Sequence, residues 1–253
     1  MSVDAKVNLL WLWPDILNLH GDRGNAMAFQ RIGHLCGVEV EVTRVTQLSQ
    51  GFDLEKADIV LLGSGEIVVL LRIIEALSGN PQLGSWIDDG GVLFAVGTTG
   101  SALGRVIHRR DGKIAGLGLL DMESHERKMI LGDDLIYKTQ DMTIYGSQVH
   151  MMDVHLGPSQ SSFGSVTYGY GNNGGSDEGA VRQNLVYTNA LGPVLVKNPW
   201  LVVDLINRAL VRRGIAEEDR LVCDPALFRF ELASAEAIQR FNDSKEKPQW
   251  ARG

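Results

Sequence analysis

Three hydroxyl side chains, Thr98, Thr99 and Ser101, follow a continuous apolar run over residues 92–96. Such a run is typical of a strand that is buried on both faces of a parallel sheet. A sharp turn from a central strand into a helix is where α/β enzymes present a nucleophilic Ser or Cys. The residue at the apex of this turn is Gly97, which has no side chain. The pattern therefore predicts the backbone of a nucleophile elbow without its reactive atom.

The hydroxyl groups beside Gly97 have no histidine near them in the sequence. A neutral hydroxyl is a weak nucleophile and needs an adjacent base that accepts its proton. Ser and Thr are also frequent at the start of helices, where they cap free backbone N–H groups. We therefore expect Thr98, Thr99 and Ser101 to cap the helix after the turn, with a relocated nucleophile as the alternative.

The composition restricts the partners of the chain. Its net charge is −7 and it has no basic cluster, which disfavours nucleic-acid binding. Cys36 and Cys223 form no CxxC pair, so we expect neither a zinc site nor a disulfide framework, but buried free thiols in a reducing compartment. We find no signal-peptide pattern and no apolar run of about 20 residues, so we expect a cytoplasmic protein without a membrane span. No motif indicates a metal or a cofactor.

The first half of the chain alternates between strand patterns and helical patterns. Strands are expected at residues 7–13, 38–45, 57–62 and 92–96, and helices at 26–36, 67–77 and 85–89. This alternation predicts a flavodoxin-like α/β fold, with a mainly parallel central sheet and helices on both faces.

The second half consists of short segments in which apolar and polar residues alternate, as in antiparallel strands. Strands are expected at 113–121, 128–138, 142–150, 165–170 and 185–188, a loop at 171–179, and helices at 200–212 and 233–241. We expect one domain over residues 1–241 and a polar C-terminal tail over 242–253.

Several motifs occur together and in one order. They are Trp-Pro-Asp-x-x-Asn-Leu-His-Gly-Asp-Arg-Gly-Asn at 13–25, Gly-Ser-Gly-Glu at 63–66, the turn at 97, Gly-Leu-Gly-Leu-Leu-Asp at 116–121, Gly-Tyr-Gly-Asn-Asn at 169–173 and Gly-Pro-Val-Leu-Val-Lys-Asn-Pro at 192–199. In this order they resemble the class I glutamine amidotransferase family of the cobyric-acid-synthase (CobB/CobQ) type. Within it, the chain is similar to the GatD-type glutaminase subunits that serve lipid II amidation in peptidoglycan synthesis.

The resemblance implies a catalytic Cys–His pair that this chain lacks. The family's nucleophilic Cys corresponds to Gly97, and its His corresponds to Leu191. A thiol is mostly protonated at neutral pH unless a neighbouring imidazole activates it, so glutamine hydrolysis needs both groups. The resemblance also implies that backbone N–H groups of Gly63 and Gly65 help to build an oxyanion hole, with Thr98 in the same pocket. We expect the chain's own glutaminase activity to be lost.

The resemblance further implies positions that bind the substrate and the partner. Arg127 or Lys128 falls near the family's arginine for the substrate carboxylate. His150 matches a His of the family's Glu-Asn-His-Gly-Gly segment, although its neighbours differ. The implied partners are a Mur-ligase-like protein of the MurT type, and glutamine or another small molecule in the pocket.

Other polar residues of these motifs have simpler interpretations. His20 and Asp22 follow the first strand, and we expect them to brace their loop rather than contact a ligand. Asn172 and Asn173 are expected to shape a turn.

Three functions are compatible with these observations. The first is a degenerate glutaminase-fold subunit that forms a heterodimer with a Mur-ligase-like partner and serves as its scaffold or regulator. The second is an active amidotransferase subunit with a relocated nucleophile. The third is a small-molecule binding protein that uses the vacated pocket. Co-purification with the partner separates the first from the third, and ammonia release from glutamine separates the second from both.

Overall fold

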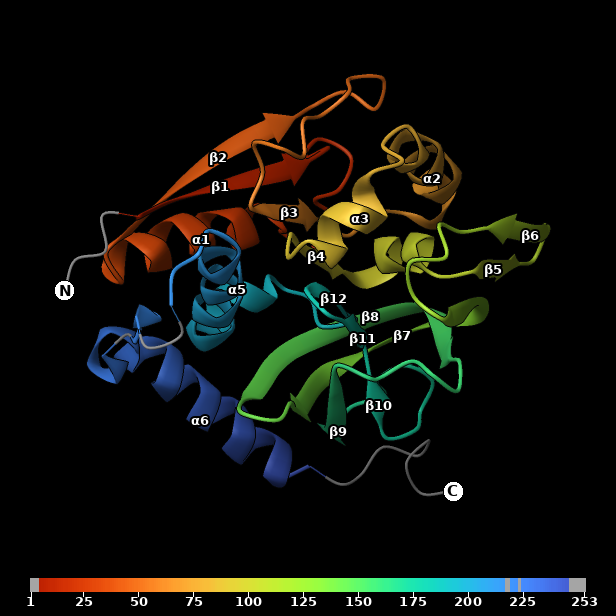
Figure 1. Cartoon of the computed structure of the whole chain (residues 1–253). Coiled ribbons are helices and arrows are strands. Elements are labelled where there is room, and N and C mark those ends of the chain that lie inside the picture. The colour runs from red at the N-terminus through yellow and green to blue at the C-terminus, as the bar shows by residue number, and fades with distance from the viewer. Residues whose placement is uncertain (1–4, 217–218, 223, 246–253) are drawn as a thin grey trace.

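The computed structural model describes residues 5–216, 219–222 and 224–245, and it places two six-stranded sheets next to each other (Figure 1). The first sheet has the strand order β11-β12-β4-β3-β1-β2, and all of its pairs are parallel except β11 with β12. Its strands are β1 (Ala5–Leu12), β2 (Val38–Val45), β3 (Ile59–Leu62), β4 (Val92–Val96), β11 (Ala180–Arg182) and β12 (Leu185–Thr188).

Helices cover both faces of this first sheet. They are α1 (Arg23–Leu35) and α5 (Pro199–Arg212) on one face, and α2 (Leu70–Ser78) and α3 (Leu83–Asp88) on the other. β4 contributes to both cores, because Val92 and Phe94 pack on the α5 side and Leu93 and Ala95 pack on the α2 side. All five residues of β4 are buried, which explains the continuous apolar run. The predicted flavodoxin-like arrangement is confirmed.

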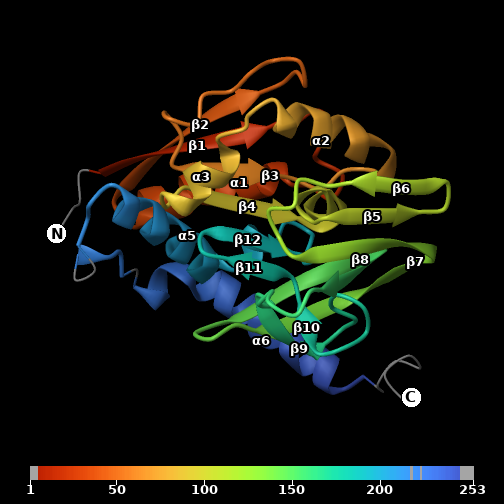
Figure 2. The ribbon, with the colours of Figure 1, turned by 45° about the vertical axis from the view of Figure 1, so that its right-hand side comes forward.

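The second sheet is mainly antiparallel, with the order β10-β9-β7-β5-β6 and with β8 paired to β7. Its strands are β5 (Val106–Arg109), β6 (Gly112–Ala115), β7 (Met122–Lys138), β8 (Thr143–Leu156), β9 (Gly164–Tyr168) and β10 (Asp177–Glu178). β7 and β8 form a long hairpin whose register shifts between Glu126 and Leu131. The last helix, α6 (Arg229–Asp243), runs beside this hairpin (Figure 2), and Lys245 Nζ lies 2.9 Å from Asp134 Oδ2 there.

The second half differs from the sequence expectations in its details. The expected strand at 113–121 holds only β6, while β5 before it was not predicted. The expected loop at 171–179 contains β10, because two of its residues pair with β9. Such short pairings leave no periodic pattern in the sequence. α6 begins at Arg229, four residues before the predicted helix, and ends at Asp243, inside the predicted tail; residues 246–253 lie outside the described residues.

The expectation of free thiols is wrong for Cys36. This residue ends α1 and is disulfide-bonded, and no free cysteine is found within the described residues. Cys223 lies outside the described residues. Sequence spacing missed the bond because spacing shows only thiols that are close along the chain.

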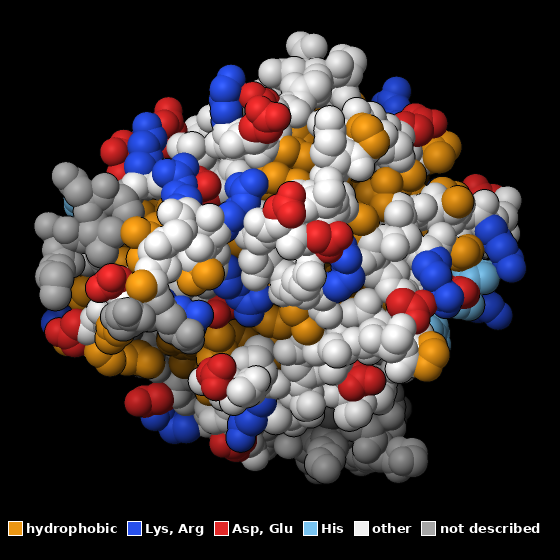
Figure 3. Space-filling view, viewed as in Figure 1, with side chains coloured by type: hydrophobic (Ala, Val, Ile, Leu, Met, Phe, Trp, Pro, Cys, Tyr) orange, Lys and Arg blue, Asp and Glu red, His pale blue; other side chains and the backbone are white. Residues whose placement is uncertain are grey.

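The distribution of surface charge and the character of the helices concern the expected interactions with nucleic acid and membrane. On the face shown in Figure 3, acidic and basic side chains are interspersed over both sheets. Among the helices of the described part of the chain, none combines the length and the apolar character that crossing a membrane requires.

Candidate active site at the turn after β4

The turn after β4 has the predicted backbone, with Gly97 at its apex. Gly97 directly follows the last strand residue, has a φ of +64° and begins a 3-10 helix, η2 (Gly97–Leu103). Glycine adopts this left-handed conformation freely, whereas other residues are strained in it. Every residue of η2 is buried. The turn is therefore a tightly packed element of the core.

Gly97 packs against two residues that follow the neighbouring strands. A Cβ atom at position 97 would lie 2.5 Å from Ser64 Oγ, after β3, and 2.8 Å from Leu191 Cδ2, after β12. β3 and β12 flank β4 in the first sheet, so the three segments after these strands meet at one edge. The structure thus brings Gly97 and Leu191, which are distant in sequence, into direct contact.

The hydroxyl groups near Gly97 do not cap the helix. No side chain makes a cap hydrogen bond at the start of η2. Thr99 Oγ1 and Ser101 Oγ are buried and have no hydrogen-bond partner among the described residues, and the same holds for Ser64 Oγ. The capping role expected for Thr98, Thr99 and Ser101 is therefore wrong, and none of these three hydroxyls is hydrogen-bonded to an imidazole of the described residues.

Asp22 and Asn25 brace the segments around the turn. Asp22 Oδ2 accepts the backbone N–H of Ser64 at 3.0 Å, and Asp22 Oδ1 accepts Asn25 Nδ2 at 3.0 Å. Asn25 Oδ1 in turn accepts the backbone N–H of Leu195 at 2.9 Å, in α4 (Val194–Lys197). Burial of Asp22 raises the pKa of its carboxyl group to about 6. The bracing role predicted for Asp22 is confirmed, whereas His20 Nε2 is buried without a hydrogen-bond partner in the described part of the chain.

The glycines at 63 and 65 allow the turn after β3 to approach the loop after β1. A Cβ at Gly63 would lie 2.3 Å from the carbonyl oxygen of Leu17, and one at Gly65 would lie 2.6 Å from Leu17 Cδ2. The backbone N–H of Leu19 donates to the carbonyl oxygen of Ser64 at 3.2 Å across the same contact. Close packing explains these two glycines, and an oxyanion-hole role for their N–H groups stays a prediction.

Leu191 is fixed in place by β8. The backbone N–H and C=O of Leu191 pair with those of Ser147 at 2.7 and 3.2 Å. Its side chain is 2% exposed and belongs to the core between the first sheet, α1 and α5. An apolar side chain therefore occupies the space next to Gly97.

His150 lies in a buried hydrogen-bonded network on β8. Its Nε2 lies 3.0 Å from the carbonyl oxygen of Asn172, and its Nδ1 lies 3.0 Å from Gln148 Nε2. Asn172 also exchanges two hydrogen bonds with Gly179, and residues 171–173 form a turn, so the turn predicted for Asn172 and Asn173 is confirmed. Burial raises the pKa of the neighbouring Glu178 carboxyl group, which accepts from Thr188 and Asn189. Both ring nitrogens of His150 are thus engaged in holding the chain together.

Arg127 and Lys128 lie where the β7–β8 register shifts. Arg127 Nη1 lies 2.5 Å from Asp153 Oδ1 and donates to Tyr170 OH at 2.7 Å, and its guanidinium stacks 4.6 Å from the Tyr170 ring centre. Lys128 is exposed. A substrate-binding role for either residue stays a prediction, and Arg127 would first have to leave Asp153.

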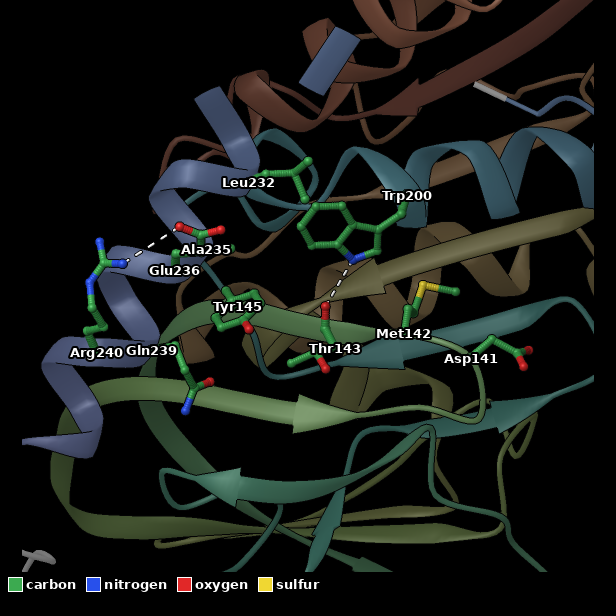
Figure 4. Close-up of a pocket in the computed structure, with 10 residues that line it drawn as sticks. All are labelled: Asp141, Met142, Thr143, Tyr145, Trp200, Leu232, Ala235, Glu236, Gln239 and Arg240. Atoms are coloured by element: carbon green, nitrogen blue, oxygen red, sulfur yellow. Dashed lines mark hydrogen bonds and ion pairs between the residues drawn. The ribbon is translucent and has the colours of Figure 1, made fainter. Parts of the chain in front are cut away.

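A cavity of about 570 Å³ opens elsewhere, between β8, α5 and α6 (Figure 4). Trp200, Met142 and Leu232 supply apolar walls, and Trp200 Nε1 donates to the carbonyl oxygen of Thr143 at 2.9 Å. None of the site residues predicted from the sequence lines it. No pattern in the sequence indicates this cavity, because its walls come from three separate segments.

The fold of the chain is of the class I glutamine amidotransferase type. A crystal structure of a glutamine amidotransferase superimposes with a TM-score of 0.55 at 16% identity, covering 79% of this chain and 98% of that chain. The glutaminase domain of Trypanosoma brucei CTPS with bound acivicin has a TM-score of 0.52 at 9% identity, covering 81% of this chain and 94% of that chain. At these identities the likeness concerns the fold alone.

Sequence comparison then assigns the family. Residues 22–197 match the CobB/CobQ-like glutamine amidotransferase domain, and the chain belongs to this family. It is 27% identical over 252 residues to the lipid II isoglutaminyl synthase (glutamine-hydrolyzing) subunit GatD of Streptococcus pneumoniae, covering 96% of this chain and 93% of the relative. It is 28% identical over 248 residues to the same subunit of Staphylococcus aureus, covering 95% and 98%. The resemblance to the GatD type is confirmed.

Proposed function

We propose that this chain is a GatD-like subunit of a lipid II amidating complex that has lost its own glutaminase activity. In this proposal it acts as a scaffold or regulator of a Mur-ligase-like partner of the MurT type, in the cytoplasm. Two relatives named as GatD subunits, aligned over almost the whole chain, support the type of complex. The observation that carries the loss of activity is the contact between Gly97 and Leu191.

This contact supports the assignment of both family positions. A catalytic Cys and its His must lie within hydrogen-bond reach of each other. A Cβ at position 97 would lie 2.8 Å from the Leu191 side chain, so groups on these two residues would meet. In this chain the pair offers neither a sulfur nor an imidazole. Acyl transfer from glutamine to a thiol therefore has no nucleophile and no base here.

The environment of the hydroxyl groups argues against a relocated nucleophile. A Ser or Thr nucleophile needs a base that takes its proton. Thr99 Oγ1 and Ser101 Oγ have no hydrogen-bond partner among the described residues, and both ring nitrogens of His150 already have partners. The vacated-pocket alternative is disfavoured as well, because Ser64 and Leu191 occupy the space beside Gly97.

The test measures ammonia release from glutamine by the purified chain, alone and co-purified with a Mur-ligase-like partner. We expect a stable complex, no glutamine-dependent ammonia release, and ligase activity supported by free ammonia. A glutamine-hydrolysing GatD serves as the positive control. Ammonia release that Thr99→Ala or Ser101→Ala abolishes would establish the relocated nucleophile instead. Release that survives Thr98→Ala, Thr99→Ala and Ser101→Ala would show that the site lies elsewhere in the chain.

The scaffold role has its own test. Light scattering of the chain mixed with the ligase should give the mass of a one-to-one heterodimer, and an unchanged mass would contradict this role. In that case, glutamine binding measured by calorimetry would decide whether the chain is a free-standing small-molecule binding protein.

A further inference from the structure

Three side chains able to bind a metal ion lie together on the second sheet. His108 is on β5, and Glu123 and His125 are on β7. His108 is the pairing partner of His125, and Glu123 precedes His125 by two residues, so all three lie on one face of the sheet. One ligand atom from each lies within 4.8 Å of the other two.

The contacts within this cluster are close. His108 Nε2 lies 2.8 Å from Glu123 Oε2, and the rings of His108 and His125 are stacked with their centres 4.1 Å apart. His155, which pairs with Glu123 across β8, packs its ring edge-on against His125 at 4.9 Å. Figure 3 shows histidine side chains, in pale blue, at the right-hand surface, where Figure 1 places β5 and β6.

Ordinary protein contacts explain only part of this arrangement. Glu123 is held by His108 through one oxygen and by Arg105 Nη2 through the other, at 3.3 Å. The imidazole of His125 has no hydrogen-bond partner among the described residues, and its ring contacts are His108 and His155. His125 is exposed, so its imidazole is open to a metal ion from solvent.

We propose that His108, Glu123 and His125 form a zinc-binding site. Two imidazoles and one carboxylate are a known protein ligand set for Zn²⁺, with a fourth position left to water. Ligand atoms at about 2.1 Å from a tetrahedral zinc ion lie about 3.4 Å apart. His108 Nε2 and Glu123 Oε2 are already 2.8 Å apart, so the wider separations, which reach at most 4.8 Å, need to shorten by up to about 1.4 Å. The side chains of His108 and Glu123 are 23% and 35% exposed, which leaves them room to rotate.

The zinc ion would join the β5–β6 hairpin to the β7–β8 hairpin within the second sheet. β5 and β7 are paired through only three residue pairs, from Val106 with Glu123 to His108 with His125, and the three ligands lie at the two ends of this pairing. A metal ion that binds only the folded chain stabilises it by mass action. No residue of the turn at Gly97 takes part, so this inference is independent of the proposed function.

The test uses the full chain, without a polyhistidine tag, and ZnCl₂ as the probe. Isothermal titration calorimetry should find one zinc ion per chain, and the temperature of unfolding should rise with zinc. The double variant His108→Ala/His125→Ala should weaken zinc binding by about tenfold or more. His34→Ala removes an exposed imidazole from α1 and should leave zinc binding unchanged.

A second readout keeps the proposal testable if the double variant folds poorly. Glu123→Gln preserves the shape of the side chain and removes the carboxylate charge, so it should also weaken binding. CoCl₂ should give the visible absorption of tetrahedral cobalt in the wild type and in His34→Ala, and lose it in Glu123→Gln. The proposal is overturned if the wild type binds no zinc, or if Glu123→Gln and the double variant bind it as the wild type does.

Discussion

Replacing Gly97 with alanine should destabilise the protein strongly, because two costs combine at this position. The backbone at φ +64° is left-handed, which costs a residue with a Cβ about 1–2 kcal/mol. The new methyl group would lie 2.5 Å from Ser64 Oγ and 2.8 Å from Leu191 Cδ2, and overpacking of a core costs about 1–3 kcal/mol. We therefore expect Gly97→Ala to lower the free energy of unfolding by about 2–5 kcal/mol.

Gly118 provides a matched control for the backbone term. Its φ is +65°, and a Cβ added there would meet no atom within 4 Å. Gly118→Ala should therefore lose only the backbone contribution, about 1–2 kcal/mol. Urea unfolding followed by circular dichroism gives both values, and their difference isolates the packing against Ser64 and Leu191. Equal losses in the two variants, or a Gly97→Ala variant as stable as the wild type, would refute the packing described here.

The same contacts determine which variants can test the proposed loss of glutaminase activity. A Cys side chain at position 97 needs the space that Ser64 now occupies, since a Cβ there would lie 3.0 Å from Ser64 Cβ. Gly97→Cys/Leu191→His alone should therefore be less stable than the wild type. Adding Ser64→Gly should recover part of the loss in urea unfolding and give the variant in which ammonia release is best measured.

Three further outcomes are expected. Burial raises the pKa of Asp22 from 3.8 to about 6, so between these values the folded state keeps a proton that the unfolded state releases. The pKa difference is about 2.2, and each unit is worth about 1.4 kcal/mol, so the free energy of unfolding should fall by about 3 kcal/mol as the pH rises from 3.8 to about 6. Urea unfolding at a series of pH values should show this fall in the wild type and not in Asp22→Asn. Asn25→Ala leaves the buried Leu195 N–H without its acceptor and should cost about 2–3 kcal/mol in urea unfolding, and a loss below about 0.5 kcal/mol would contradict the brace. Asp58→Ala breaks the two-pronged ion pair with Arg213, at 2.7 and 2.8 Å, and should lower the temperature of unfolding by several degrees, whereas an unchanged temperature would show the pair to be dispensable.

The predicted limits are most accurate for strands and helices in which the apolar pattern and the residues at the ends indicate the same boundaries. β4, β2 and β12 have the predicted limits, and α5 begins one residue earlier, at Pro199. Each combines a clear apolar pattern, continuous in β4 and periodic in β2 and α5, with Gly, Pro or Asn at an end. Along the second sheet the limits were missed, because the strands continue through polar residues such as Glu123 and His155, which follow cross-strand pairing rather than an apolar period.

What the sequence did not predict arises from residues that are far apart along the chain. The cavity beside Trp200 and the cluster around His125 each join separate segments. Their members follow no motif spacing, so only the paired strands and packed helices place them together. The capping role expected for Thr99 and Ser101 failed for a related reason, because the turn is packed inside the core, where these hydroxyls meet no free N–H group.

The two most specific motifs of the chain, at residues 18–25 and 192–199, hold the backbone around the turn in place. This structural role accounts for both motifs without a catalytic role. Asp22 binds the segment after β3, and Asn25 binds the start of α4, two residues after Gly192-Pro193. A Cβ at Gly24 would lie 2.4 Å from Pro193 Cγ, so the two motifs also pack directly against each other. Residues 18–25 and 192–199 are thus two halves of one brace around Gly97. Likeness in these residues therefore supports the family's fold at this turn, whereas the proposed loss of activity concerns positions 97 and 191.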